Sequence, residues 1–541
     1  PVTGFDASDV TLSGTAGAAT VNVTGLDAVY TLEVSGMAND GTVVAQIPAG
    51  AAQDSAGNGN TASTSADNEV TYDTTGATVT VEQAAGQPDP ANASPILFTV
   101  TFNEPVTGFD ASDVTLSGTA GATTVNVTGL GAVYTLEVSG MTDSGTVIAD
   151  IPAGAALDAA GNPSQARTST DNEVTYDADT PTVTVEQALG QPDPANAAPI
   201  LFTVTFSESV TGFDAGDVLL AGTAGAAAVN VAGSGAVYTL EVSGMANDST
   251  VIAAIPANAA QDSAGNGNTA STSADNTVTY DTTAPTVTVE QALGQADPTN
   301  ATPINFTVTF SEPVGGFTAS DVILSGTAGA TTVNVTGGGA IYNLAVSGMT
   351  GNGTVIAQVP AGAAQDGAGN LNLASTSIDN EVTYDALGPT VTINQAAGQA
   401  DPTNLSPIDF TVVFSEPVTG FDASDVQLSG TAGATTAVVT GSGAVYNVAV
   451  SGMANDGTVI ASIPFGAAQD TSANDSLAST STDNTIFYDT TPPVVTIGAP
   501  SLAITNNGPV TFPVTVSGAS AVNLTEGDVT LNVTGTANGT V

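Results

Sequence analysis

Hydrophobic and polar residues alternate along most of this chain, and the alternation predicts short β-strands. Ile96, Phe98, Val100 and Phe102 occupy every second position of the segment 95–103, which places all four on one face of a strand. Gly-rich segments separate this stretch from others that are rich in Val, Thr, Ile and Tyr. No segment combines a helical period with capping residues. We therefore expect an all-β fold.

One unit of this pattern contains seven predicted strands. They cover residues 78–83, 95–103, 113–117, 123–128, 131–139, 145–151 and 172–177. Seven short strands within about 100 residues are typical of an antiparallel β-sandwich of the immunoglobulin type. In such a sandwich the alternating hydrophobic residues of both sheets face a shared core.

The unit recurs at a fixed interval. The segment that begins at Pro1 with PVTGFD returns in closely similar form at Pro105, Ser209, Pro313 and Pro417, so each copy starts 104 residues after the one before. A fixed period of the size of a small domain indicates tandem modules, each with its own core. The predicted fold class is thus a linear tandem array of seven-stranded immunoglobulin-like β-sandwiches.

The period also predicts the module boundaries. The expected modules are residues 1–73, 77–177, 181–281, 285–385, 389–489 and 493–541. We expect the first to be incomplete at its N-terminal side and the last to be divergent and incomplete at its C-terminal side, as in a stretch of a longer protein. Short linkers that carry Pro are expected to hold neighbouring modules end to end.

Two motifs carry a resemblance to a known family. The run FSEPVTGFDASDV at 414–426, together with the D-x-A-G-N loop that begins at Asp262, resembles the bacterial immunoglobulin-like domains of large surface and adhesin-type proteins. The resemblance covers residues 1–489 well, whereas the segment from Val494 departs from it in detail. It implies an extracellular structural role, since such modules serve as spacers, stalks and sometimes ligand-binding tips.

The charge balance excludes several functions. The chain has 52 acidic residues, one basic residue and no His, which gives a formal net charge of −51. Such a chain lacks the cations that nucleic acids and anionic membrane surfaces require. No apolar run approaches the roughly 20 residues of a membrane helix, so we expect no membrane insertion. The one base, Arg167, stands where other units have Ser63 and Ser271, and we interpret it as drift.

Catalysis is not expected. The chain has no Cys, no His and no Lys, which removes Ser-His and Cys-His pairs, zinc sites built on His or Cys, and Schiff-base chemistry. Paired carboxylates could hydrolyse glycosides, but here they recur in every unit. Such recurrence is better explained by a structural ion than by repeated active sites.

The expected strand order brings acidic loops together at the module junctions. The loops after the second and sixth strands lie at one end of a module, and they face the first loop and the last strand end of the preceding module. The expected metal ligands at the junction of the second and third modules are Asp89, Asn92, Asp177, Glu208, Asp214, Asp217 and Asp262. At the next junction they are Asp193, Asn196, Asp281, Glu312, Asp321 and Asp366. At the one after it they are Asp297, Asn300, Asp385, Glu416, Asp422, Asp425 and Asp470.

Electrostatics favour a bound cation over solvated loops at these junctions. Two carboxylates ~5 Å apart repel each other by ~3 kcal/mol at an effective dielectric constant of 20. With one Arg in the chain, no protein cation can neutralise a junction, but a hard cation can. Ca²⁺ accepts carboxylate, amide and backbone oxygens more readily than Mg²⁺ in flexible loops. The alternative is that these residues are turn formers that bond their own backbone. The junction after Asp489 lacks the Glu, so a site there is expected to be weaker or absent.

Three functions are compatible with the sequence. The first is a rod-like stalk or extender of a bacterial surface adhesin, stiffened by Ca²⁺ at the junctions. The second is a self-assembling subunit of an extracellular filament, sheath or surface layer. The third, an array of carbohydrate-binding modules, is the weakest because aromatic residues make up 5% of the chain and Trp is absent. The expected partners are other copies of the chain, or a cell-surface or matrix ligand bound by regions outside this sequence.

Overall fold

The structure is a computed structural model that describes residues 1–519, 521–532, 534 and 540–541. Strands are the main regular elements of these residues, and the helical elements among them are 3-10 turns of three residues each. The predicted all-β fold is confirmed. Part of the predicted module 493–541 (residues 520, 533 and 535–539) lies outside the described residues. Within the described ranges, no helix has the length and apolar character needed to cross a membrane.

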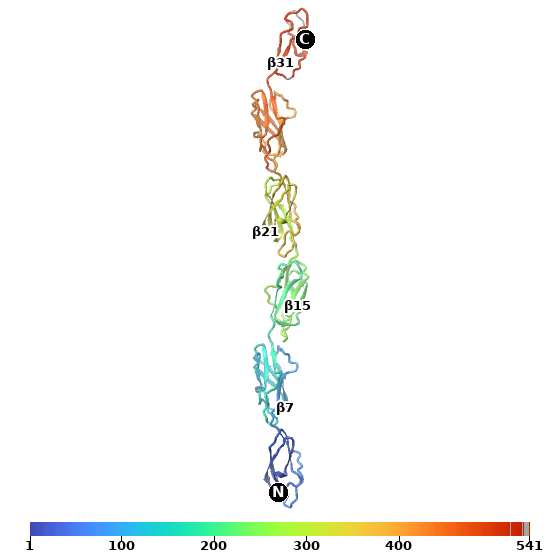
Figure 1. The fold of residues 1–541 in the computed structure, drawn as a ribbon, viewed down its shortest axis with the longest axis vertical. Helices are drawn as coiled ribbons and strands as arrows, with labels where there is room; N and C mark the ends of the chain where they lie inside the picture. Colours follow the sequence, from blue (N-terminus) through green and yellow to red (C-terminus); the bar gives the residue numbers. More distant parts are fainter. Residues whose placement is uncertain (520, 533, 535–539) are drawn as a thin grey trace. The chain divides into compact units, whose positions relative to one another are not determined.

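The chain divides into two compact units, Pro1–Thr282 and Thr283–Val541. The strands of the first unit occur in three successive groups, and the labelled strands β7 and β15 lie in separate groups (Figure 1). The first group contains β1 (Thr11–Ser13), β2 (Thr20–Leu26), β3 (Val29–Ser35), β4 (Gly41–Gln46) and β5 (Glu69–Tyr72). The second contains β6 (Val79–Gln83), β7 (Ile96–Val106), β8 (Thr115–Ser117), β9 (Thr124–Ser139), β10 (Gly145–Asp150) and β11 (Glu173–Tyr176). The third contains β12 (Val183–Gln187), β13 (Ile200–Val210), β14 (Leu219–Ala221), β15 (Ala228–Ser243), β16 (Ser249–Ala254) and β17 (Thr277–Tyr280).

The second unit repeats the same order of strands. Its first group contains β18 (Val287–Gln291), β19 (Ile304–Val314), β20 (Ile323–Ser325), β21 (Thr332–Ser347), β22 (Gly353–Gln358) and β23 (Glu381–Tyr384). Its second contains β24 (Val391–Gln395), β25 (Ile408–Val418), β26 (Gln427–Ser429), β27 (Thr436–Ser451), β28 (Gly457–Ser462) and β29 (Thr485–Tyr488). The antiparallel pair β30 (Val494–Ile497) and β31 (Val514–Ser517) follows.

Each complete module has two three-stranded antiparallel sheets. In the second module one sheet has the order β6-β7-β9 and the other the order β11-β10-β8. Buried residues of both sheets, such as Phe98 of β7 and Val147 of β10, belong to one hydrophobic cluster. Full burial of such a side chain contributes about 1.5–3 kcal/mol. The shared cluster is consistent with the expected β-sandwich.

The predicted fourth and fifth strands of the second module form the single element β9, which folds back on itself. A Cβ atom at Gly129 would lie 2.5 Å from the backbone oxygen of Val133, so the two halves of β9 run side by side around this point. Asn126 of the first half donates a hydrogen bond to Glu137 of the second half at 3.0 Å. Only Gly tolerates this close approach and its φ of 126°.

In the first five modules, a short 3-10 turn precedes the predicted third strand. The sequence did not predict these turns. In the second module, η2 (Ala111–Asp113) has Asp110 as its N-cap, and Asp110 and Asp113 together form a capping box. The Asp110 carboxylate accepts a hydrogen bond from the Ser112 amide at 2.8 Å. The motif FDASD therefore encodes a capped turn, too short to show a helical period.

Three aromatic rings fix the end of β7. Phe102, Phe109 and Tyr134 meet edge to face, with ring centroids 5.0 to 6.0 Å apart. The Tyr134 hydroxyl donates a hydrogen bond to the backbone oxygen of Val106 at 3.4 Å. The pairing of β7 with β9 shifts register between Thr101 and Val106. An irregularity of this kind redirects the side chains within it, and Glu104 lies in this segment.

Candidate metal centre at the module ends

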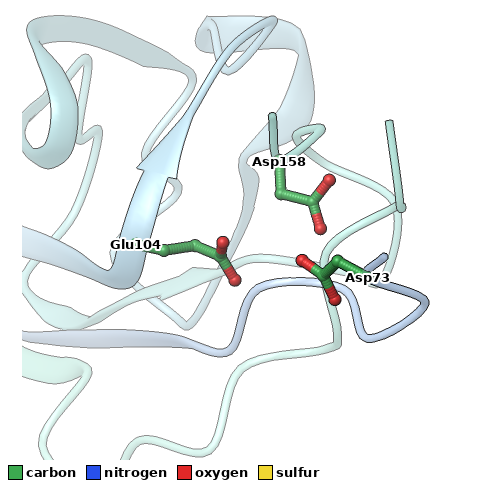
Figure 2. Close-up of side chains that lie close together, drawn as sticks. All are labelled: Asp73, Glu104 and Asp158. Carbon is green, nitrogen blue, oxygen red and sulfur yellow. The ribbon is translucent and has the colours of Figure 1, made fainter. Parts of the chain in front are cut away.

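Three carboxylates from two adjacent modules converge beside this irregular segment. Asp73 follows β5 of the first module, Glu104 lies near the end of β7, and Asp158 lies in the loop between β10 and β11. One carboxylate oxygen from each residue lies within 4.8 Å of the others. Figure 2 shows the three carboxyl groups turned towards a common space. We call such a set a carboxylate triad.

The loop that carries Asp158 is built around this carboxylate. Asp158 is buried, and its Oδ1 accepts hydrogen bonds from the amides of Ala160 and Asn162 at 2.8 and 2.9 Å. The Asn162 side-chain amide donates to Asp158 Oδ2 at 2.9 Å and to the backbone oxygen of Asp73 at 3.0 Å. The D-x-A-G-N motif thus holds Asp158 in place and also contacts the linker from the preceding module.

The same arrangement recurs in both units. In the first unit, Asp177, Glu208 and Asp262 converge within 4.8 Å, and Asn266 donates to the backbone oxygen of Asp177 at 2.8 Å. In the second unit, the converging residues are Asp385, Glu416 and Asp470, and Asn474 donates to the backbone oxygen of Asp385 at 2.9 Å. Of the corresponding residues Asp281, Glu312 and Asp366, the first belongs to the first unit and the other two to the second.

The surroundings raise the pKa of the Glu in three of these triads, whereas burial of Asp158 is outweighed by hydrogen bonds from its own loop, which lower its pKa. Burial raises the pKa of Glu104, and the charges of Asp158 and Asp73 raise it further. Burial likewise raises the pKa of Glu208, helped by Asp262 and Asp177. For Glu416, burial acts together with Asp470 and Asp385 in the same direction. The triads therefore concentrate negative charge even though partial burial and mutual repulsion of the carboxylates oppose it.

No basic side chain is left to neutralise the triads. Arg167, the one base of the chain, pairs through Nε with Asp150 and donates through Nη1 to the backbone oxygen of Ser169 at 3.2 Å. The interpretation of Arg167 as drift overlooked this pair. The other modules have Gln46, Ala254, Gln358 and Ser462 at the position of Asp150, so the acid and the base occur together in the second module.

The structure gives several of the predicted ligands a different role. Asp214 and Asp217 form the capping box of the 3-10 turn Ala215–Asp217, and Asp422 and Asp425 form that of Ala423–Asp425. Asp321 caps the turn Ala319–Asp321 in the same way, with Thr318 in place of the first Asp. Among the described residues, no triad includes any of these five acids. Each already forms hydrogen bonds within its own turn, as in the alternative interpretation of these acids as turn formers instead of metal ligands.

The predicted ligands of the first loop of each module hold that loop to its own module. Asp89, Asp193 and Asp297 each accept a hydrogen bond from a backbone amide of the last strand, at 2.9 to 3.0 Å, and lie outside the triads among the described residues.

Two of the predicted Asn residues do face the next module. A Cβ atom at Gly265 would lie 3.4 Å from the side-chain nitrogen of Asn92. Asn300 donates a hydrogen bond to the side chain of Asn474 at 3.0 Å. Asn196 is exposed. The expected meeting of the first loop with the next module is thus present at Asn92 and Asn300, through amides rather than through a shared metal ligand.

The triad of Asp73, Glu104 and Asp158 was not among the predicted sites. The signal for it was the period itself, because these residues precede Asp177, Glu208 and Asp262 by 104 positions.

The donor set of the triads fits a hard metal ion. Three carboxylates offer up to six oxygens, and backbone oxygens of the linker lie beside them, as the contacts of Asn162 and Asn266 show. Hard divalent cations are bound by such oxygen donors. The triads could therefore bind a metal ion.

Comparisons with known proteins add no family assignment. No family model matches the chain, and no curated protein matches it.

Proposed function

We propose that this chain is an extracellular structural repeat protein, the stalk or extender of a bacterial surface adhesin, with Ca²⁺ stiffening its module junctions. The observation that supports this proposal most strongly is the triad shared between the end of one module and the next module, in a chain that has one basic residue. The resemblance of the repeats to bacterial immunoglobulin-like domains supports the cell-surface setting.

A cation at a triad would link two modules directly. Asp177 belongs to the linker, whereas Glu208 and Asp262 belong to the module that follows it. A cation that binds all three fixes the linker against that module. Without a cation, repulsion among the three carboxylates favours conformations in which the linker moves away. Cation binding therefore converts a repulsive contact into an ordered one.

Ca²⁺ is the cation that best suits this site. It takes six to eight oxygen ligands in flexible geometries, whereas Mg²⁺ requires a nearly ideal octahedron. Extracellular modules bind Ca²⁺ with Kd values of about 10⁻⁴ to 10⁻³ M, which suits a millimolar extracellular concentration. At about ten times Kd, a site of this kind stabilises the folded state by about 1.4 kcal/mol.

Small-angle X-ray scattering of the whole chain tests this function. The maximum dimension is expected to be greater in millimolar Ca²⁺ than in EDTA, because ordered linkers restrict bending. A matched variant with Glu104→Gln, Glu208→Gln and Glu416→Gln is expected to show a smaller difference between the two conditions than the native chain.

Two results would contradict the stalk. Identical scattering of the native chain in Ca²⁺ and EDTA would remove the role of the cation. A mass of many chains, in either condition, would instead favour a self-assembling filament or surface-layer subunit.

A further inference from the structure

A second pattern repeats with the modules, in the turn before the sixth predicted strand and in the linker that follows the module. We call the residue in this turn the turn residue, and the first two residues after the linker Asp the linker pair. The turn residues are Asp40, Ser144, Asp248, Asn352 and Asp456. The corresponding linker pairs are Thr74-Thr75, Ala178-Asp179, Thr282-Thr283, Ala386-Leu387 and Thr490-Thr491. Every acidic turn residue is matched by a Thr-Thr pair, and every neutral one by a pair that begins with Ala.

An acidic turn residue binds the hydroxyls of its linker pair. Asp40 Oδ1 accepts hydrogen bonds from the amide and the hydroxyl of Thr74 at 2.9 and 2.7 Å, and Oδ2 accepts from the Thr75 hydroxyl at 2.5 Å. Asp456 accepts from the amide and the hydroxyl of Thr490 at 2.8 and 2.7 Å and from the hydroxyl of Thr491.

The third acidic turn residue makes the same contacts with the first Thr of its linker pair. Asp248 accepts from the amide and the hydroxyl of Thr282 at 2.9 and 2.8 Å. In all three cases one carboxylate holds a linker amide and the hydroxyl of the same Thr.

A neutral turn residue holds the same linker amide but uses a different second partner. Ser144 Oγ accepts from the Ala178 amide at 3.0 Å and donates to Asp177 Oδ1 at 3.2 Å. Asn352 Oδ1 accepts from the Ala386 amide at 2.9 Å, and its side-chain nitrogen donates to Asp385 Oδ1. The second partner is thus the linker Asp itself.

Hydrogen-bonding chemistry explains why acidic turn residues occur with Thr-Thr linker pairs and neutral turn residues with linker pairs that begin with Ala. An ionised carboxylate only accepts hydrogen bonds, so it needs the hydroxyl donors that Thr supplies and Ala lacks. The linker Asp occurs in every one of these modules, beside acidic and neutral turn residues alike. A neutral side chain donates its own hydrogen bond to this Asp, as Ser144 does to Asp177, and makes the Thr hydroxyls unnecessary.

We infer that the turn residue and the linker pair form two alternative clamps, an acid clamp and a neutral clamp, that order each linker without a metal ion. This inference goes beyond the proposed function, because neither clamp requires a cation. Thr hydroxyls and amides hold the pKa of Asp456 at about 2 and lower that of Asp40, so the acid clamp stays ionised at neutral and mildly acidic pH.

The clamps can be tested by exchanging them within the whole chain in EDTA at pH 7. The readout is residue-resolved hydrogen exchange of the Ala178 amide, which donates to Ser144, and of the Asp179 amide, which donates at 3.1 Å to the Asp177 oxygen that also accepts from Ser144. Ser144→Asp alone is expected to accelerate their exchange roughly tenfold, the scale of one charge-assisted hydrogen bond. Adding Ala178→Thr and Asp179→Thr is expected to restore the native rate. Ala85→Asp, which adds a charge at an exposed turn of the same module, is expected to leave these amides unchanged.

The reverse exchange in another module provides the second test. Asp456→Ser alone is expected to accelerate hydrogen exchange of the amides at 490 and 491. Adding Thr490→Ala and Thr491→Asp recreates the turn residue and linker pair of the second module, and is expected to slow the exchange again. The Val147 and Val459 amides, in the buried cores, report whether each module stays folded. If the single substitutions leave the linker amides unchanged, or the combined ones fail to restore them, the paired clamps are wrong.

Discussion

Replacement of Glu416 by Gln should stabilise its module in EDTA but not in Ca²⁺. Glu416 lies in a triad with Asp385 and Asp470, with one oxygen of each within 4.8 Å of the others. At an effective dielectric constant of about 20, one such pair repels by about 3 kcal/mol. Solvent screening of these partly exposed groups reduces this figure, so in EDTA the variant is expected to stabilise the module by roughly 1–2 kcal/mol.

In Ca²⁺ the variant should lose this advantage, because Gln supplies one neutral oxygen in place of two charged ones. At about 10 mM Ca²⁺, a site with a Kd of about 10⁻⁴ to 10⁻³ M stabilises the native module by roughly 1.4–2.7 kcal/mol. The variant is expected to lose most of this gain. The advantage of the variant in EDTA, roughly 1–2 kcal/mol, is thus expected to be cancelled in Ca²⁺ by the native chain's gain of roughly 1.4–2.7 kcal/mol.

Hydrogen exchange of buried amides in β25 and β27 measures these differences for this module alone. A change of 1–2 kcal/mol alters the exchange rate by a factor of about 5–30. Asp409→Asn is the matched control, since Asp409 is an exposed acid of the same module and lies outside the triad. The account is refuted if Glu416→Gln and Asp409→Asn respond alike in both conditions, or if both variants gain as much from Ca²⁺ as the native chain.

Three further predictions concern other groups. In EDTA, the pKa of Glu104 is raised above its ordinary value of 4.5, so the folded state binds this proton more tightly than the unfolded state does. The stability that protonation of Glu104 contributes is present below pH 4.5 and is lost as pH rises through the raised pKa. Denaturation at stepped pH should therefore show stability rising as pH falls from 7 towards 5, and no rise would contradict the repulsion. Asp422→Ala should lower stability equally in Ca²⁺ and EDTA, measured by hydrogen exchange, because Asp422 caps a turn; a selective loss of the Ca²⁺ response would make it a ligand. Arg167→Ser should change stability by no more than about 1 kcal/mol, measured by denaturation, because it exchanges a partly exposed ion pair for the Ser of other modules; a larger loss would show that the pair organises the module.

The sequence predicted the sheets because their signal is local. Ile96, Phe98, Val100 and Phe102 alternate, and all four are buried in β7. The meeting of Asp177 with Glu208 and Asp262 also followed from the sequence, since strand order fixes which loops share a module end.

The assignment of individual acids needed the structure. The sequence FDASD is suited equally to capping and to metal binding, and only the hydrogen bonds place Asp214 and Asp217 in a cap. The pairing of Asp150 with Arg167 and that of Ser144 with Asp177 join positions far apart in the sequence. Neither has a local pattern that would identify it.

Isothermal titration of the whole chain with Ca²⁺ tests the central claim most directly. The account predicts binding with a Kd of about 10⁻⁴ to 10⁻³ M, fewer sites when Glu208 alone is replaced by Gln, and a further loss when Glu104→Gln and Glu416→Gln are added. Native chain that takes up no Ca²⁺ at millimolar concentration, or a triple variant that binds as the native chain does, would contradict it.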